Sequence, residues 1–97
     1  MAIPLEVLRS QIKDIDADLV RLLKKRMSLV RQIGAVKRRS GLNMVDSLRE
    51  QQILEQVVSL PHDPIPTRSL LLLFRHIIRI SHQIQTELYS GKLENRP

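Results

Sequence analysis

Apolar side chains recur every three or four residues along the first forty positions, which is the period of one face of an α-helix. These positions are Leu8, Ile12, Ile15, Leu19, Leu22, Leu29, Ile33 and Val36. A helix entry tolerates Pro4, and Ser40-Gly41 supplies a stop signal. The pattern predicts one amphipathic helix over residues 5–39, with a length of about 50 Å.

Two shorter helices are predicted after the long one. The first covers residues 47–60, and the second covers residues 67–90, because three prolines between positions 61 and 66 exclude a helix there. The inward face of the second helix carries Leu70, Leu71, Phe74, Ile77, Ile78, Ser81, Ile84, Gln85 and Leu88. No segment has the period of a strand, so we expect an all-α fold of one long and two short helices, with a frayed tail over residues 91–97.

The length of the first helix also predicts an assembly. A chain of 97 residues forms a single domain, residues 1–97, that buries a modest fraction of its own surface. Two short helices cannot cover an apolar stripe of this length. We therefore expect the same stripe of a second copy to complete the core, in an intertwined homodimeric helical bundle.

Composition narrows the class of partner. The net charge of +6 favours an anion, whether a nucleic acid, an anionic membrane surface or a small polycarboxylate. The absence of cysteine excludes disulfides and thiolate metal sites. Neither a signal-peptide pattern nor a run of membrane-spanning length is present, so we expect a cytoplasmic protein without a membrane partner.

Arg26 interrupts the apolar stripe between Leu22 and Leu29. Its guanidinium is expected to point into the bundle, where it binds an anionic ligand, pairs with a neighbouring carboxylate or extends to the surface. Lys37 follows eleven residues later, on the same helical face and roughly 16 Å away. It either shares a ligand with Arg26 or belongs to the solvated run Lys37-Arg38-Arg39.

Arg9 lies about 25 Å before Arg26 along the helix axis and about 100° around it. Arg9 therefore cannot contact a small ligand beside Arg26 of its own chain, but it reaches the other subunit's pocket if the long helices pair antiparallel. On the last helix, Ser81 and Gln85 share the apolar face at a spacing of four residues. They either face a ligand or bond the local backbone.

The middle helix begins with polar residues that have a structural explanation. Ser47 and Glu50 are spaced as a capping box, and Asp46 is favourable at a helix N-terminus. Asp14, Asp16 and Asp18 imitate a calcium loop but lack its glycine, and His76 and His82 are six residues apart and do not share a face well. We expect a reaction that needs no covalent or metal catalyst.

Together these residues resemble the all-helical chorismate mutases, the AroQ class, over residues 5–89. The resemblance is carried, in order, by Leu8 to Ile12, Ile15-Asp16, Leu22 to Arg26, Ile33 to Lys37, Asp46 with Arg49-Glu50, and Phe74 with Ser81 and Gln85. It implies an intertwined dimer with two shared active sites and no cofactor. It also implies isomerisation of chorismate to prephenate, a step towards phenylalanine and tyrosine.

The resemblance assigns a role to each polar position. Arg26, together with Arg9 from the partner chain, is expected to bind the two carboxylates of chorismate, and Ser81 to assist one of them. Lys37 and Gln85 are expected to bond the ether oxygen. Glu50 is expected to accept a hydrogen bond from the ring hydroxyl, with Asp46 and Arg49 lining the site beside it.

These roles suit an intramolecular rearrangement. The ether oxygen gains negative charge as its bond to carbon breaks, so fixed donors at that oxygen stabilise the transition state more than the ground state. The neutral amide of Gln85 donates at any pH, which predicts activity without a requirement for acid. Two alternatives remain: an isochorismate-pyruvate lyase of the same fold, and a basic helical module that binds nucleic acid.

Overall fold

The computed structural model describes residues 2–89, and within them the chain is entirely helical apart from its connections. Helix α1 spans Leu5–Ser40, α2 spans Ser47–Ser59 and α3 spans Thr67–Tyr89. The prediction of an all-α fold with one long and two short helices is confirmed. Each helix begins at its predicted residue and ends within one residue of its predicted end. The tail expected to fray, residues 91–97, and the side chain of Leu88 lie outside the described residues.

Helix α1 ends at a glycine with a left-handed backbone. Gly41 has φ 67° and ψ 23°, and its N–H donates to the carbonyl of Arg38. The next residue, Leu42, donates its N–H to the carbonyl of Lys37 at 2.9 Å. This pair of backbone hydrogen bonds is the Schellman motif, and it turns the chain sharply towards α2.

Asp46 caps helix α2, which corrects the predicted capping box. The Asp46 carboxylate accepts a hydrogen bond from the backbone N–H of Arg49 at 3.0 Å. Ser47 is therefore the first helical residue instead of the cap, and Glu50 lies one position beyond the place where a reciprocal cap would reach. The Glu50 side chain is left available for contacts elsewhere.

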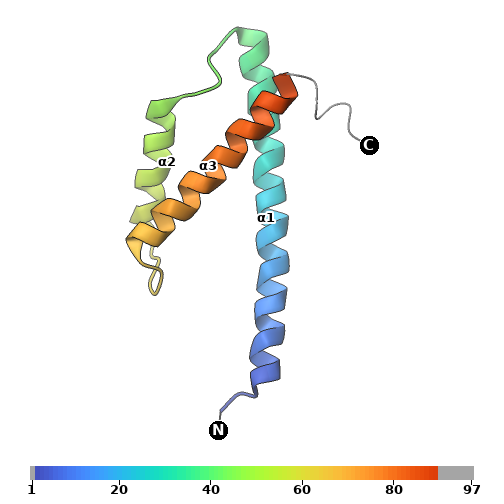
Figure 1. Ribbon diagram of the computed structural model, residues 1–97, viewed down its shortest axis with the longest axis vertical. Coiled ribbons are helices and arrows are strands. Elements are labelled where there is room, and N and C mark those ends of the chain that lie inside the picture. The colour runs from blue at the N-terminus through green and yellow to red at the C-terminus, as the bar shows by residue number, and fades with distance from the viewer. Residues whose placement is uncertain (1, 90–97) are drawn as a thin grey trace.

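Helix α3 joins the other two helices. It crosses α1 near the C-terminal half of α1 and packs along α2, whereas α1 and α2 do not pack directly on each other (Figure 1). The molecule is accordingly flat, with extents of 60 × 35 × 15 Å. Its core is small and centres on α3, with Val30, Val57, Leu70, Ile77 and Ile78 as the buried apolar residues among those described.

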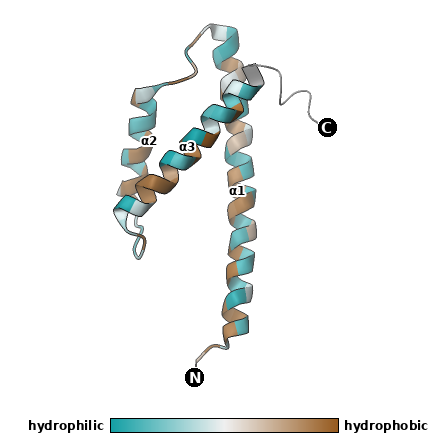
Figure 2. Cartoon of the chain, viewed as in Figure 1, coloured by the Kyte–Doolittle hydropathy of each residue, from teal (hydrophilic) through white to brown (hydrophobic). Residues whose placement is uncertain are grey.

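The N-terminal half of α1 projects away from the other helices (Figure 1). Figure 2 shows apolar segments recurring along this bare half as well as along the covered half. The stripe residues Leu8, Ile12, Ile15, Leu19 and Leu22 are between 40% and 59% exposed. An apolar face of this extent is unusual on a stable monomer. In the described residues, no helix has both the length and the apolar character needed to cross a membrane.

Candidate active site

A pocket of about 260 Å³ lies where α1, α2 and α3 approach one another beside the connection from α1 to α2. Apolar side chains from all three helices line it together with polar and mostly charged side chains. Its lining consists of Arg26, Leu29, Val30, Ile33, Lys37, Met44, Asp46, Arg49, Glu50, Ile53, Ile78, Ser81, His82 and Gln85. The volume suits a small metabolite.

Every residue that the sequence singled out for the site lines this pocket, with the exception of Arg9. Arg9 is exposed on the bare half of α1, seventeen residues before Arg26. It therefore lies outside the pocket of its own chain. Residues far apart in the sequence meet here because α3 folds back across α1.

Arg26 is partly buried and directed towards α3. Its Nη1 donates to the hydroxyl of Ser81 at 2.8 Å. Burial lowers the pKa of the Arg26 guanidinium, and the positive charge of nearby Arg49 lowers it further. Among the described residues of this chain no carboxylate pairs with Arg26. The guanidinium is a charged donor that an anion in the pocket would stabilise.

Ser81 and Gln85 are buried on α3, with 8% and 7% of their surface exposed. The Ser81 hydroxyl donates to the carbonyl of Ile77 at 3.0 Å and accepts from Arg26. The Gln85 amide donates to the carbonyl of Val30 on α1 at 3.4 Å, a long hydrogen bond. Each of these two residues therefore bonds a backbone carbonyl and also lines the pocket.

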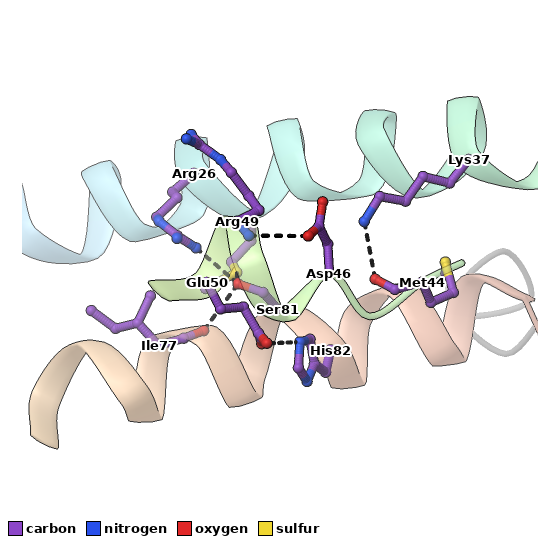
Figure 3. Close-up of polar contacts among 10 residues, drawn as sticks. Arg26, Lys37, Met44, Asp46, Arg49, Glu50, Ile77, Ser81 and His82 are labelled. Atoms are coloured by element: carbon purple, nitrogen blue, oxygen red, sulfur yellow. Dashed lines mark hydrogen bonds and ion pairs between the residues drawn. The ribbon is translucent and has the colours of Figure 1, made fainter. Parts of the chain in front are cut away.

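Lys37 turns back towards the connection after α1. Its Nζ donates to the carbonyl of Met44 at 3.0 Å. The side chain is half-buried, whereas Arg39 in the same run is exposed. Lys37 is therefore not simply a solvated member of that run. Figure 3 shows its ammonium directed to the same side of α1 as the guanidinium of Arg26.

Asp46, the N-cap of α2, and Arg49 and Glu50 within α2 also line the pocket. The Arg49 side chain extends towards α1, and Glu50 points towards α3 (Figure 3). There the Glu50 Oε1 lies 2.6 Å from Nε2 of His82. Sequence reasoning had considered His82 only as a metal ligand with His76 and missed its place in the pocket. No periodicity in the sequence signals this contact, because it depends on how α2 lies on α3.

The arrangement is suited to an anion with an apolar body. Arg26, Lys37 and Arg49 supply three positive groups, and apolar side chains from all three helices also line the pocket. In residues 2–89 no group of three or more potential metal ligands comes together. The chemistry that the described side chains offer is hydrogen bonding and charge stabilisation around a bound molecule.

Comparison with known proteins identifies a matching family model and curated relatives with two different names. The family model described as chorismate mutase type II matches residues 8–86. A bifunctional chorismate mutase/prephenate dehydratase of Aquifex aeolicus is 32% identical over 76% of this chain and 22% of its own length. A 3-dehydroquinate dehydratase of Pyrobaculum aerophilum is 38% identical over 54% of this chain and 17% of its own length. The chain thus spans about a fifth of the length of the curated relatives it matches.

Solved structures of two chorismate mutases superpose on this chain over nearly their whole length. The chorismate mutase of Thermus thermophilus, in its form II, superposes with a TM-score of 0.82 at 27% identity, covering 84% of this chain and 93% of its own. The chorismate mutase of Helicobacter pylori in complex with prephenate superposes with a TM-score of 0.78 at 25% identity, covering 96% and 97%. The fold, the matched residues and the polar pocket lead to one conclusion: the chain belongs to the chorismate mutase type II family.

Proposed function

We propose that this protein isomerises chorismate to prephenate. The observation that carries the proposal is the convergence of Arg26, Lys37 and Arg49 on one pocket of metabolite size that apolar side chains also line. Membership of the family and the likeness to a structure that holds prephenate support the same substrate. A small dicarboxylate matches these three charges better than a nucleic acid, which needs an extended basic surface.

Catalysis rests on donors held at the ether oxygen of the substrate. Lys37 and Gln85 enter the pocket from α1 and α3, and each is already a hydrogen-bond donor in the absence of a ligand. We infer that both exchange their backbone acceptors for the ether oxygen. Because negative charge grows at this oxygen during bond cleavage, the two donors bind the transition state more tightly than the substrate.

The remaining polar groups orient the substrate. Arg26 is braced by Ser81 and binds one carboxylate, which selects the folded shape in which the two reacting carbons meet. Glu50 accepts a hydrogen bond from the ring hydroxyl, while Asp46 and Arg49 line the site beside it. No step in this scheme forms a covalent bond to the protein.

We further propose that two copies form an intertwined dimer in which Arg9 of each chain completes the other's site. The support is the bare half of α1, whose exposed apolar stripe includes Leu8, Ile12 and Ile15 beside Arg9. Because these side chains are already about half buried, completing their burial contributes roughly 1 kcal/mol each, which favours association. An antiparallel arrangement of two α1 helices carries Arg9 towards the partner's Arg26.

The test is loss of chorismate absorbance with identification of the product. Wild type should form prephenate, and Arg26→Ala and Lys37→Ala should each lower kcat/KM by about 100-fold or more, because each removes a charged contact to the reacting molecule. The exposed neighbours Lys25 and Arg39 provide the matched controls Lys25→Ala and Arg39→Ala, which should retain activity. Turnover of isochorismate instead, or no turnover of either compound, would contradict the proposal.

A further inference from the structure

The contact between Glu50 and His82 crosses the seam between α2 and α3. Glu50 Oε1 lies 2.6 Å from His82 Nε2, and Figure 3 shows the two side chains meeting end to end. The side chains are 25% and 37% exposed, so both are partly withdrawn from water. A short hydrogen bond to a carboxylate in this setting is among the stronger polar contacts in proteins.

His82 and Glu50 also form part of a wall between two depressions. On one side is the candidate active site, and on the other is a depression of about 290 Å³ that Leu54, Arg75, Ile78 and Arg79 line together with this pair. In the second depression the charged groups beside His82 are Glu50 from α2 and the exposed Arg75 and Arg79 from its own helix, and the candidate active site adds Arg26, Lys37, Asp46 and Arg49. Among the described residues, the carboxylate that contacts His82 is that of Glu50.

The hydrogen-bonding capacity of the two side chains determines which atom donates and which accepts. An ionised carboxylate only accepts, so the Nε2–H of His82 must donate to Glu50 Oε1. This bond selects the ring tautomer and holds the carboxylate in one orientation. In the described residues the second oxygen of Glu50 has no donor, which leaves it able to accept a hydrogen bond from a ligand.

We propose that His82 is a positioning residue, which orients Glu50 so that its second carboxylate oxygen accepts the ring hydroxyl of the substrate. The proposal rests on the function proposed above and adds to it a residue that acts through Glu50. The hydroxyl is on the carbon next to the one whose C–O bond breaks, but the hydroxyl itself forms and loses no bond, so this contact acts mainly through binding and orientation of the substrate. Loss of His82 is therefore expected to raise KM more than it lowers kcat.

Kinetics with three variants tests this role. His82→Leu should raise KM for chorismate about tenfold, as expected for the loss of one charge-assisted hydrogen bond. His82→Gln retains a donor and should restore most of the affinity. In a Glu50→Gln background, His82→Leu should add little further loss, because the two residues act as a unit. His76→Leu, on an exposed position of the same helix, is the control.

Two kinetic results would overturn the proposal. In the first, His82→Leu leaves KM unchanged while wild type is active. In the second, the effects of His82→Leu and Glu50→Gln multiply in full, which would mean that His82 contacts the ligand independently. Helical circular dichroism of each variant separates lost folding from lost binding.

A measurement without substrate tests the contact itself. Imidazole ¹⁵N and ¹H NMR of the ligand-free wild type should show a downfield, hydrogen-bonded Nε2–H for His82, assigned by comparison with His82→Leu, and Glu50→Ala should move that signal to the position of a free Nε2–H. A ring indifferent to Glu50→Ala overturns the contact whatever the activity. Conversely, an intact NMR signature in a protein that does not turn over chorismate would refute the proposed function, and the positioning role with it.

Discussion

The polar side chains of the pocket restrain one another in the absence of a ligand. Ser81 links Arg26 to the backbone of α3, and Gln85 links α3 to the backbone of α1. In the described residues no buried side-chain nitrogen or oxygen lacks a partner. Such preorganisation lowers the cost of ordering these groups when a substrate arrives.

Among single residues, the role of Gln85 is tested by the substitution Gln85→Glu. The wild-type amide donates at any pH, so kcat/KM should not rise steeply below pH 6. A glutamate at the same buried position donates only when it is protonated, and burial raises the pKa of a carboxyl. The variant should therefore be active at acid pH and lose activity as the pH rises through that pKa. A pH profile of both proteins checks this, and parallel profiles would contradict the role of Gln85.

The polar residues of the site could be chosen from the sequence because they interrupt an apolar helical face. Arg26, Ser81 and Gln85 were identified in that way, since a polar side chain on such a face requires a partner. His82 carries no such signal, because its contact depends on where α2 meets α3. Lys37 was found by its spacing from Arg26 on one helical face, but its acceptor, on the connection after Gly41, follows from no such pattern.

The ends of the helices are determined locally. Gly41 ends α1 through its positive φ, and Asp46 begins α2 through a side-chain hydrogen bond. The short connection between them carries Met44, which accepts from Lys37 and lines the pocket. The geometry of this turn thus helps to position part of the site.

Gly41→Ala should lower the free energy of unfolding by about 1 kcal/mol, the usual cost of a side chain in the left-handed region. A Cβ at position 41 would meet no atom within 4 Å, so the cost comes from backbone conformation and not from a clash. Urea denaturation measures the change, with Ser40→Ala as the control at the preceding residue. An equal or greater stability of Gly41→Ala would show that the turn rearranges.

The sequence predicted the three helices well because each has a clear apolar period and a strong stop or start signal. The capping box was the wrong choice at α2, since Asp46 and Ser47 are both good caps and adjacent. The choice between them places Glu50 in a different local role, and only the structure resolves it. An error of one residue in the choice of the cap thus changed the interpretation of a site residue.

The whole molecule is flat and has a small core. A shape of 60 × 35 × 15 Å leaves most of the apolar stripe of α1 exposed. A second copy that covers this stripe would bury it and bring an arginine to each pocket. Association and completion of the site are then the same event.

Mixing two inactive variants tests this arrangement. Arg9→Ala and Arg26→Ala should each be nearly inactive alone. In a mixed dimer, one site combines the intact Arg26 of one chain with the intact Arg9 of the other, so co-refolding should recover about a quarter of wild-type activity by statistics of random pairing. Measured chorismate turnover that stays at the level of the separate variants would mean that Arg9 acts within its own chain or not at all.

The sequence by itself determined the helices, their order and the polar residues that face inward, because these follow from local periodicity and from the cost of burying charge. Only the tertiary structure decided how α3 lies across α1 and α2. That packing creates the pocket, brings Ser81 to Arg26, and pairs His82 with Glu50. Contacts between distant segments depend on the relative placement of whole helices, which no local pattern encodes.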